Sequence, residues 1–163
     1  MNKKGFTLIE LLAVLTLLAI VVGISIYSIG NVFKNAKEKS EDAFVATLSD
    51  ALEMYLTSSD AKTELSSGSR CDVDLNKSNG KTVNVYNVEI NFNDVINSQY
   101  KPLTSKDFVN PANKKVECLD TAPVTIYRDD DYVYYYSFER SSLGCLTNED
   151  GMVTNLPQGF DCE

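Results

Sequence analysis

The residues of this sequence best suited to covalent chemistry are four cysteines, all placed after residue 70: Cys71, Cys118, Cys145 and Cys162. In an oxidising compartment, an even number of cysteines in a small domain predicts two disulfides. Three pairings are possible. We favour Cys71–Cys118 with Cys145–Cys162, because sequential pairing closes two separate loops and the second ties down the C-terminus. A zinc site is the alternative, but no two of the cysteines lie within four residues of each other, as paired zinc ligands usually do.

The sequence contains no histidine. This removes Ser-His-Asp and Cys-His nucleophile pairs and the commonest metal ligand. A glycine-rich phosphate loop is missing too. The 23 acidic residues against 15 lysines and arginines give a net charge of −8, so a pair of carboxylates indicates nothing specific. The same acidity argues against general nucleic-acid binding, which depends on clustered basic side chains. We therefore predict that the chain is not an enzyme and uses no cofactor or metal.

Two other clusters could bind a ligand, but each has a simpler structural interpretation. Residues 129–131 are three aspartates that could contribute to a Ca²⁺ site. The alternating spacing and the glycine of a calcium loop are missing, so a solvated hairpin tip is favoured. Residues 132–136 hold four tyrosines that could form an aromatic binding surface. A strand that buries and exposes rings on alternate faces is the favoured interpretation.

Glu10 is the single charged residue between Phe6 and Phe33. The uncharged stretch that follows it, residues 11–33, would span about 35 Å as a helix, against a hydrocarbon thickness of about 30 Å. A carboxylate in such an apolar run is costly unless it is paired or lies near the interface. A cleaved secretory signal would have a shorter apolar core. A plain membrane anchor would leave Glu10 unexplained.

The segment Gly5-Phe6-Thr7-Leu8-Ile9-Glu10, which follows a short basic leader, closely resembles the processing motif of type IV pilins and pseudopilins. All six residues match, and the resemblance covers roughly residues 1–60. It implies that a membrane prepilin peptidase cuts between Gly5 and Phe6 and then N-methylates Phe6. Glycine suits the cleavage site because it has no side chain to obstruct the backbone in a protease groove.

The resemblance also implies that Glu10 and Thr7 act in assembly. The family keeps a glutamate at the fifth position after the cut, which Glu10 occupies. Among packed apolar helices, the nearest cation is the amino terminus of Phe6 on a neighbouring subunit. Pairing the two charges would set the axial register of one helix against the next. The alternative is that Glu10 lies at the level of the lipid headgroups and only extends to the interface.

These residues require a long N-terminal helix followed by a β-rich domain. No proline precedes Pro102, so nothing forces a break before the helix end expected near residues 58–60. Apolar residues recur at helical spacing after residue 43 and predict an amphipathic second half: Phe44, Leu48, Leu52 and Tyr55. The predicted organisation is a leader (1–5), a membrane-spanning and filament-core helix (6–33), the amphipathic half of the same helix (34–59) and an extracellular β-rich pilin head (60–163).

The head is predicted to be an antiparallel sheet packed on the amphipathic half of the helix, which makes the fold α+β. We expect residues 61–81 to form a loop. A strand over residues 83–92 should carry a bulge near Tyr86-Asn87, where its apolar residues change parity. The remaining expectations are a short helix over 94–100 capped by Asn93, a hairpin of residues 124–127 and 132–138, and two short strands around 148–151.

With this architecture, the resemblance implies a structural subunit of a type IV pilus, major or minor, that serves adhesion, motility or aggregation. The precursor would cross the cytoplasmic membrane once, and the assembled subunit would lie in a cell-surface pilus. Its partners would be other pilin subunits, the prepilin peptidase, an assembly ATPase, a platform protein and the membrane. The alternative is a pseudopilin of a type II secretion or DNA-uptake system. A third class is a membrane-anchored binding protein that never polymerises.

Overall fold

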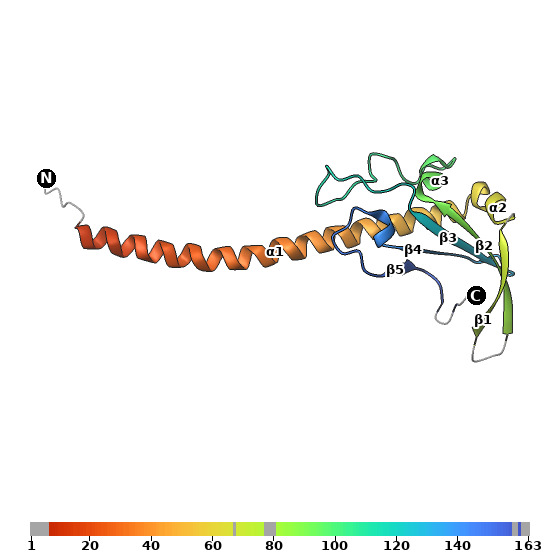
Figure 1. Ribbon diagram of the computed structural model, residues 1–163, viewed down its shortest axis with the longest axis horizontal. Helices are drawn as coiled ribbons and strands as arrows, with labels where there is room; N and C mark the ends of the chain where they lie inside the picture. The colour runs from red at the N-terminus through yellow and green to blue at the C-terminus, as the bar shows by residue number, and fades with distance from the viewer. Residues whose placement is uncertain (1–6, 67, 77–80, 158–159, 161–163) are drawn as a thin grey trace. The chain divides into compact units, whose positions relative to one another are not determined.

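The computed structural model of the chain describes residues 7–66, 68–76, 81–157 and 160. This part of the chain is α+β, as predicted, and contains a long helix, a five-stranded sheet and short helical segments (Figure 1). The chain divides into two compact units, one ending at Lys39 and the other beginning at Ser40. We call the second unit the head. Helix α1 (Leu8–Leu56) runs through both units.

Helix α1 agrees closely with the helix expected between residue 6 and residues 58–60, and it contains no proline. In the first unit its apolar side chains are exposed; Leu8, for example, is 83% exposed. Within the residues that the structure describes, no helix combines the length and the apolar character needed to cross a membrane.

The head is built on an antiparallel sheet in which each strand pairs with the next one along the chain (Figure 1). Its strands are β1 (Ser69–Asn76), β2 (Lys81–Asn91), β3 (Pro123–Asp129), β4 (Tyr134–Glu139) and β5 (Met152–Thr154). The predicted β3–β4 hairpin is confirmed. Tyr132 at its tip adopts a left-handed conformation, with φ of 63°, which is uncommon for a residue with a side chain.

One face of the sheet packs on the head portion of α1, and this contact forms the hydrophobic core. Leu48 and Leu52 of α1 are fully buried against a cluster that includes Val124 and Ile126 of β3. The predicted apolar stripe is thus confirmed. Burying such side chains contributes roughly 1.5–3 kcal/mol each, so this contact is what holds the helix to the sheet.

The predicted bulge in β2 is absent, because β2 buries residues on the opposite face of the sheet as well. The pairing of β2 with both neighbours is continuous through Tyr86-Asn87, and the register shift lies in β1, between Asp74 and Asn76. Val85 is fully buried but lies outside the main core. It pairs with Asp129, on the face where Phe160 stacks on β3 and β4. The change of parity therefore reflects a strand that buries residues on both of its faces, Val85 on one and Ile90 on the other.

Several expected elements differ in position or type. The predicted loop over 61–81 contains helix α2 (Ser59–Ser66) and strand β1. Helix α2 buries Ala61 and Leu65, four residues apart. The short helix is α3 (Phe92–Asn97), and its N-cap is Asn91 rather than Asn93, in a capping box with Asp94. In the C-terminal region, the 3₁₀ turn η1 (Ser141–Leu143) and a loop precede β5, so only one of the two expected strands is present there.

Candidate functional site

Thr7 and Glu10, the two predicted assembly residues, meet at the start of α1. The carbonyl oxygen of Thr7 accepts the backbone N–H of Glu10 at 3.0 Å, and its hydroxyl lies 3.4 Å from the same nitrogen. This is the threonine half of a capping box, for which Thr-x-x-Glu is the usual sequence. Sequence reasoning missed this local role of Thr7, although the spacing could have indicated it. Gly5 and Phe6, the predicted cleavage residues, lie outside the described residues.

The Glu10 side chain lies exposed in the first turn of α1. A negative charge there is favourable, because the first turn of a helix carries unpaired N–H groups and the positive end of the helix dipole. Since the carboxylate faces outward, a cation on another molecule can reach it. The position is therefore compatible with the predicted pairing to a neighbouring subunit.

The first unit displays an unusually apolar helix surface. Soluble monomers rarely expose contiguous apolar patches larger than a few hundred Å², and larger ones mark interaction sites. Large apolar side chains between residues 8 and 33 that are at least 45% exposed are Leu8, Ile9, Leu11, Leu12, Val14, Leu15, Leu17, Leu18, Ile20, Val21, Val22, Ile29, Val32 and Phe33. This surface, which we call the apolar segment, begins within the motif that contains Glu10 and continues beyond it.

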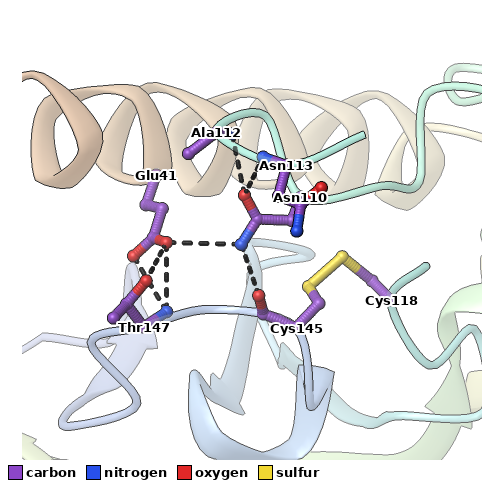
Figure 2. The surroundings of a disulfide bond; sticks show 7 residues. All are labelled: Glu41, Asn110, Ala112, Asn113, Cys118, Cys145 and Thr147. Carbon is purple, nitrogen blue, oxygen red and sulfur yellow. Dashed lines mark hydrogen bonds between the residues drawn. A yellow bond between two sulfur atoms is a disulfide. The ribbon is translucent and has the colours of Figure 1, made fainter. Parts of the chain in front are cut away.

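The head contains a disulfide between Cys118 and Cys145 (Figure 2). The favoured pairing of Cys71 with Cys118 and Cys145 with Cys162 is therefore wrong. That prediction assumed that neighbours in sequence pair, but the sheet brings the loop before β3 beside the loop after η1, where the backbone N–H of Leu119 donates to the carbonyl of Leu143. The Cys71 side chain and Cys162 lie outside the described part of the chain. The second of the two predicted disulfides therefore stays a prediction.

Replacing both Cys118 and Cys145 by serine should lower the free energy of unfolding by about 3–4 kcal/mol, because the bridge closes a loop with a sequence separation of 27. Urea unfolding of the two proteins, followed by circular dichroism, measures the difference. The exposed Ser141→Ala variant on the adjacent turn serves as control. An unfolding midpoint unchanged by the double substitution would contradict this account.

The prediction that all three aspartates of the β3–β4 hairpin form a solvated tip is wrong for one of them. Asp129 is buried, and its carboxylate accepts the Val133 N–H at 2.8 Å and the Tyr135 hydroxyl at 3.2 Å. Burial, together with the negative charge of Asp129, raises the pKa of Tyr135. Asp129 thus stabilises the hairpin tip. Among the described residues, no cluster of three or more potential ligands is placed to hold a metal ion.

The tyrosines of β4 follow the predicted alternation of faces, whereas Tyr132 lies outside the strand, in the turn. Tyr136 is buried in the main core, whereas Tyr135 lies on the other face of β4, with its ring 5.8 Å from that of Phe160. The guanidinium carbon of Arg128 lies over the rings of Tyr86 and Tyr132, at 4.7 and 5.0 Å from their centres. Packing contacts thus account for Tyr135 and Tyr136, while Tyr132 stays 69% exposed beside Arg128.

The comparisons with known proteins bear on the N-terminal motif. Residues 1–26 match the family model of the prokaryotic N-terminal methylation motif. Neither the curated proteins nor the solved structures gave a match to the chain. The matched range includes Gly5, Phe6, Thr7 and Glu10 and extends into the apolar segment. The chain therefore carries at its N-terminus the signature of type IV pilins and their precursors.

Proposed function

We propose that the chain is the precursor of a structural subunit of a type IV pilus, assembled into a surface filament that serves adhesion, motility or aggregation. The observation that carries this proposal is the methylation motif at residues 1–26, which overlaps the exposed apolar segment of α1. A motif for N-terminal processing and an apolar helix surface together suit a subunit that is first held at the membrane and then packs by its helix against other subunits.

Assembly would transfer the apolar segment from lipid to a core of neighbouring helices. Such a transfer gains little from the hydrophobic effect, because lipid is as apolar as the helix core. The favourable terms would be close packing and the pairing of Glu10 with the amino terminus of Phe6 on the next subunit. The proposed partners are sister subunits, the prepilin peptidase, an assembly ATPase and a platform protein. No catalytic activity is proposed.

A pseudopilin of a type II secretion or DNA-uptake system is the second candidate, because the same motif begins both kinds of subunit. The head favours the pilus. It has a disulfide and long loops between α3 and β3 and between η1 and β5. A covalent cross-link of this kind suits a subunit exposed outside the cell, where reducing systems are absent.

Mass spectrometry of the mature chain, taken from filaments sheared off the cell surface, tests the proposal. We expect a polypeptide that begins at Phe6 and carries one methyl group on its amino terminus. The matched control is a strain without the prepilin peptidase, in which the chain should keep Met1 and be missing from the sheared fraction. A chain found only at the cell envelope but correctly processed would favour the pseudopilin. An intact Met1 terminus in wild-type filaments would overturn both candidates.

A further inference from the structure

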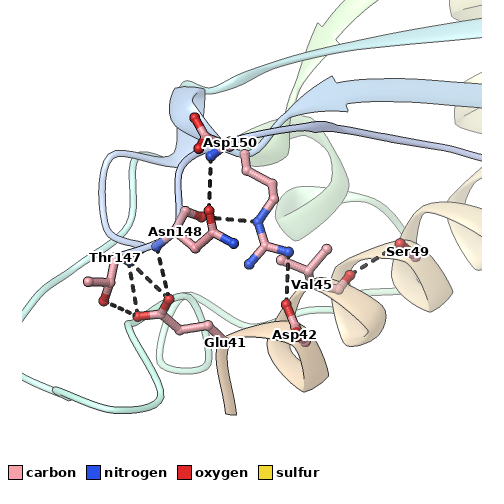
Figure 3. Close-up of polar contacts among 8 residues, drawn as sticks. Glu41, Asp42, Val45, Ser49, Thr147, Asn148 and Asp150 are labelled. Carbon is pink, nitrogen blue, oxygen red and sulfur yellow. Dashed lines mark hydrogen bonds and ion pairs between the residues drawn. The ribbon is translucent and has the colours of Figure 1, made fainter. Parts of the chain in front are cut away.

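Glu41 of α1 is a fully buried carboxylate, with an exposed fraction of 0%. Its oxygens accept the backbone N–H of Thr147 at 3.0 and 3.1 Å and that of Asn148 at 3.3 Å (Figure 3). The Thr147 hydroxyl also donates to it. Burying a carboxylate is costly unless several donors surround it. The donors here come from a segment more than 100 residues away in the sequence.

A second buried side chain extends this network to the disulfide. Asn110, 3% exposed, donates from Nδ2 to Glu41 at 3.3 Å and also to the carbonyl oxygen of Cys145 (Figure 2). Its Oδ1 accepts the backbone N–H groups of Ala112 and Asn113. Asn110 therefore holds its own loop in shape and connects that loop to both Glu41 and Cys145. We call Glu41, Asn110, Thr147 and the Cys118–Cys145 bridge the clasp.

The loop between η1 and β5, residues 144–151, is held in place by the hydrogen bonds of this clasp and not by pairing in the sheet. Two of its backbone N–H groups, those of Thr147 and Asn148, donate to the Glu41 carboxylate and not to a backbone carbonyl. A strand or helix would satisfy these groups whatever the state of a side chain. Here one ionisable group satisfies them, so a change in that group alters the loop directly.

We propose that the clasp is a conformational switch: the ionised Glu41 carboxylate holds residues 144–151 against α1, and its protonation releases that loop while the sheet and the core stay folded. The proposal stands on the geometry of four donors converging on one buried carboxylate. It does not depend on whether the chain forms a filament.

The direction of the switch follows from the hydrogen bonds. Burial by itself would raise the pKa of Glu41, but the bonds from Thr147, Asn148 and Asn110 outweigh it and lower the pKa below the usual value. A group whose pKa is lowered by folding contributes stability above its unfolded pKa, about 4.3 for glutamate. That contribution is lost as the pH falls through the lower, folded value. The loop is therefore held at neutral pH and released in acid.

No charged group that the structure describes near Glu41 changes the direction of its pKa shift. Its neighbour in sequence, Asp42, is paired with Arg140 at 2.9 Å, and the Arg140 Nε donates to the Asn148 carbonyl at 3.1 Å. Other charged residues close to Glu41 in sequence or in the adjoining loops are exposed: Lys37, Glu38 and Lys39 on α1, Glu149 and Asp150 in the loop, and Lys114, Lys115 and Glu117 beyond Asn110. The lowered pKa of Glu41 arises from hydrogen bonds, with no charged neighbour among its causes.

Amide hydrogen exchange of the full chain in detergent micelles, resolved to single residues and corrected for the intrinsic rate at each pH, tests the switch. At pH 6, Glu41→Gln should lower the protection of the Thr147 and Asn148 amides at least tenfold and leave that of the Ile126 amide in β3 unchanged. In the wild-type protein the same two amides should lose protection to a similar extent between pH 6 and pH 3. The variant should show no further step.

Glu53→Gln is the matched control, because Glu53 is an exposed glutamate on the same helix. It should behave as the wild type at both pH values. Equal protection of Thr147 and Asn148 in Glu41→Gln and wild type at pH 6 would overturn the proposal. So would a parallel loss at Ile126, which would mean global unfolding and not release of a loop. If the Glu41→Gln protein does not fold, the wild-type comparison between pH 6 and pH 3 decides the question by the same criteria.

Discussion

Cells that express the Glu10→Gln variant are expected to yield at least tenfold fewer surface filaments than wild-type cells, with normal amounts of the subunit in the envelope. On the proposed function, Glu10 leaves water on assembly and pairs with the amino terminus of a neighbouring Phe6. Removing one partner of a buried ion pair costs about 3–5 kcal/mol, because the other charge stays buried without compensation. Each 1.4 kcal/mol is a factor of ten in an equilibrium constant, so the loss per contact is large.

Glutamine keeps the size of the side chain and its ability to accept a hydrogen bond, so a change of packing does not explain the expected loss. Filament yield is measured by electron microscopy and by immunoblotting of the sheared fraction. Glu38→Gln, an exposed substitution farther along α1, is the control and should give wild-type yield. Regular filaments at normal yield from the Glu10→Gln strain would refute the pairing, and Glu10 would then have only its local role in the first turn of the helix.

The features that could be predicted from sequence are those set by local pattern. Helix α1 follows from a long stretch without proline and an apolar repeat at helical spacing, and its observed bounds are within a few residues of those expected. The β3–β4 hairpin follows from two β-rich runs around a polar tip. The N-terminal motif is local as well, since Gly5 to Glu10 are consecutive. In each case the feature can be predicted from residues that are close together in the sequence.

The errors arose where packing from distant segments decides the outcome. The apolar residues of β2 change parity because Phe160, about 75 residues later, helps to cover the second face of the sheet, and no local pattern reports that cover. Helix α2 is polar overall, and only Ala61 and Leu65 mark the side that the core buries. Strand β1 could have been recognised, because its sequence alternates apolar and charged residues from Arg70 to Leu75.

The clasp was beyond prediction from sequence for a different reason. Glu41 lies among charged residues on an amphipathic helix, where a solvated side chain is the ordinary expectation. Its burial depends on donors from Asn110 and Thr147, which are brought together by the fold and the Cys118–Cys145 bridge. A buried carboxylate becomes apparent only when its donors are known. The favoured disulfide pairing failed for the same reason.

Phe92→Ala is expected to lower the free energy of unfolding of the head by about 3–5 kcal/mol, more than any other single substitution considered. Phe92 is fully buried, and its ring lies 5.2 Å from those of both Phe108 and Phe138. The centre of the Phe108 ring lies in turn 6.1 Å from the centre of the Phe44 ring on α1, in an edge-to-face arrangement. The ring therefore connects the helix, the loop and strand β4. Its removal loses the transfer energy of the side chain, leaves a cavity and breaks two aromatic contacts.

Small domains are stable by only about 5–15 kcal/mol, so this loss takes a large fraction of the total. Urea unfolding, followed by tyrosine circular dichroism because the chain has no tryptophan, should show the midpoint falling by on the order of 2 M. Tyr100→Ala, an exposed aromatic residue just beyond α3, should move the midpoint little. Phe92→Leu should fall between the two, since leucine fills part of the cavity but restores neither ring contact. A Phe92→Ala midpoint close to that of Tyr100→Ala would show that the helix and the sheet are held together without this aromatic cluster.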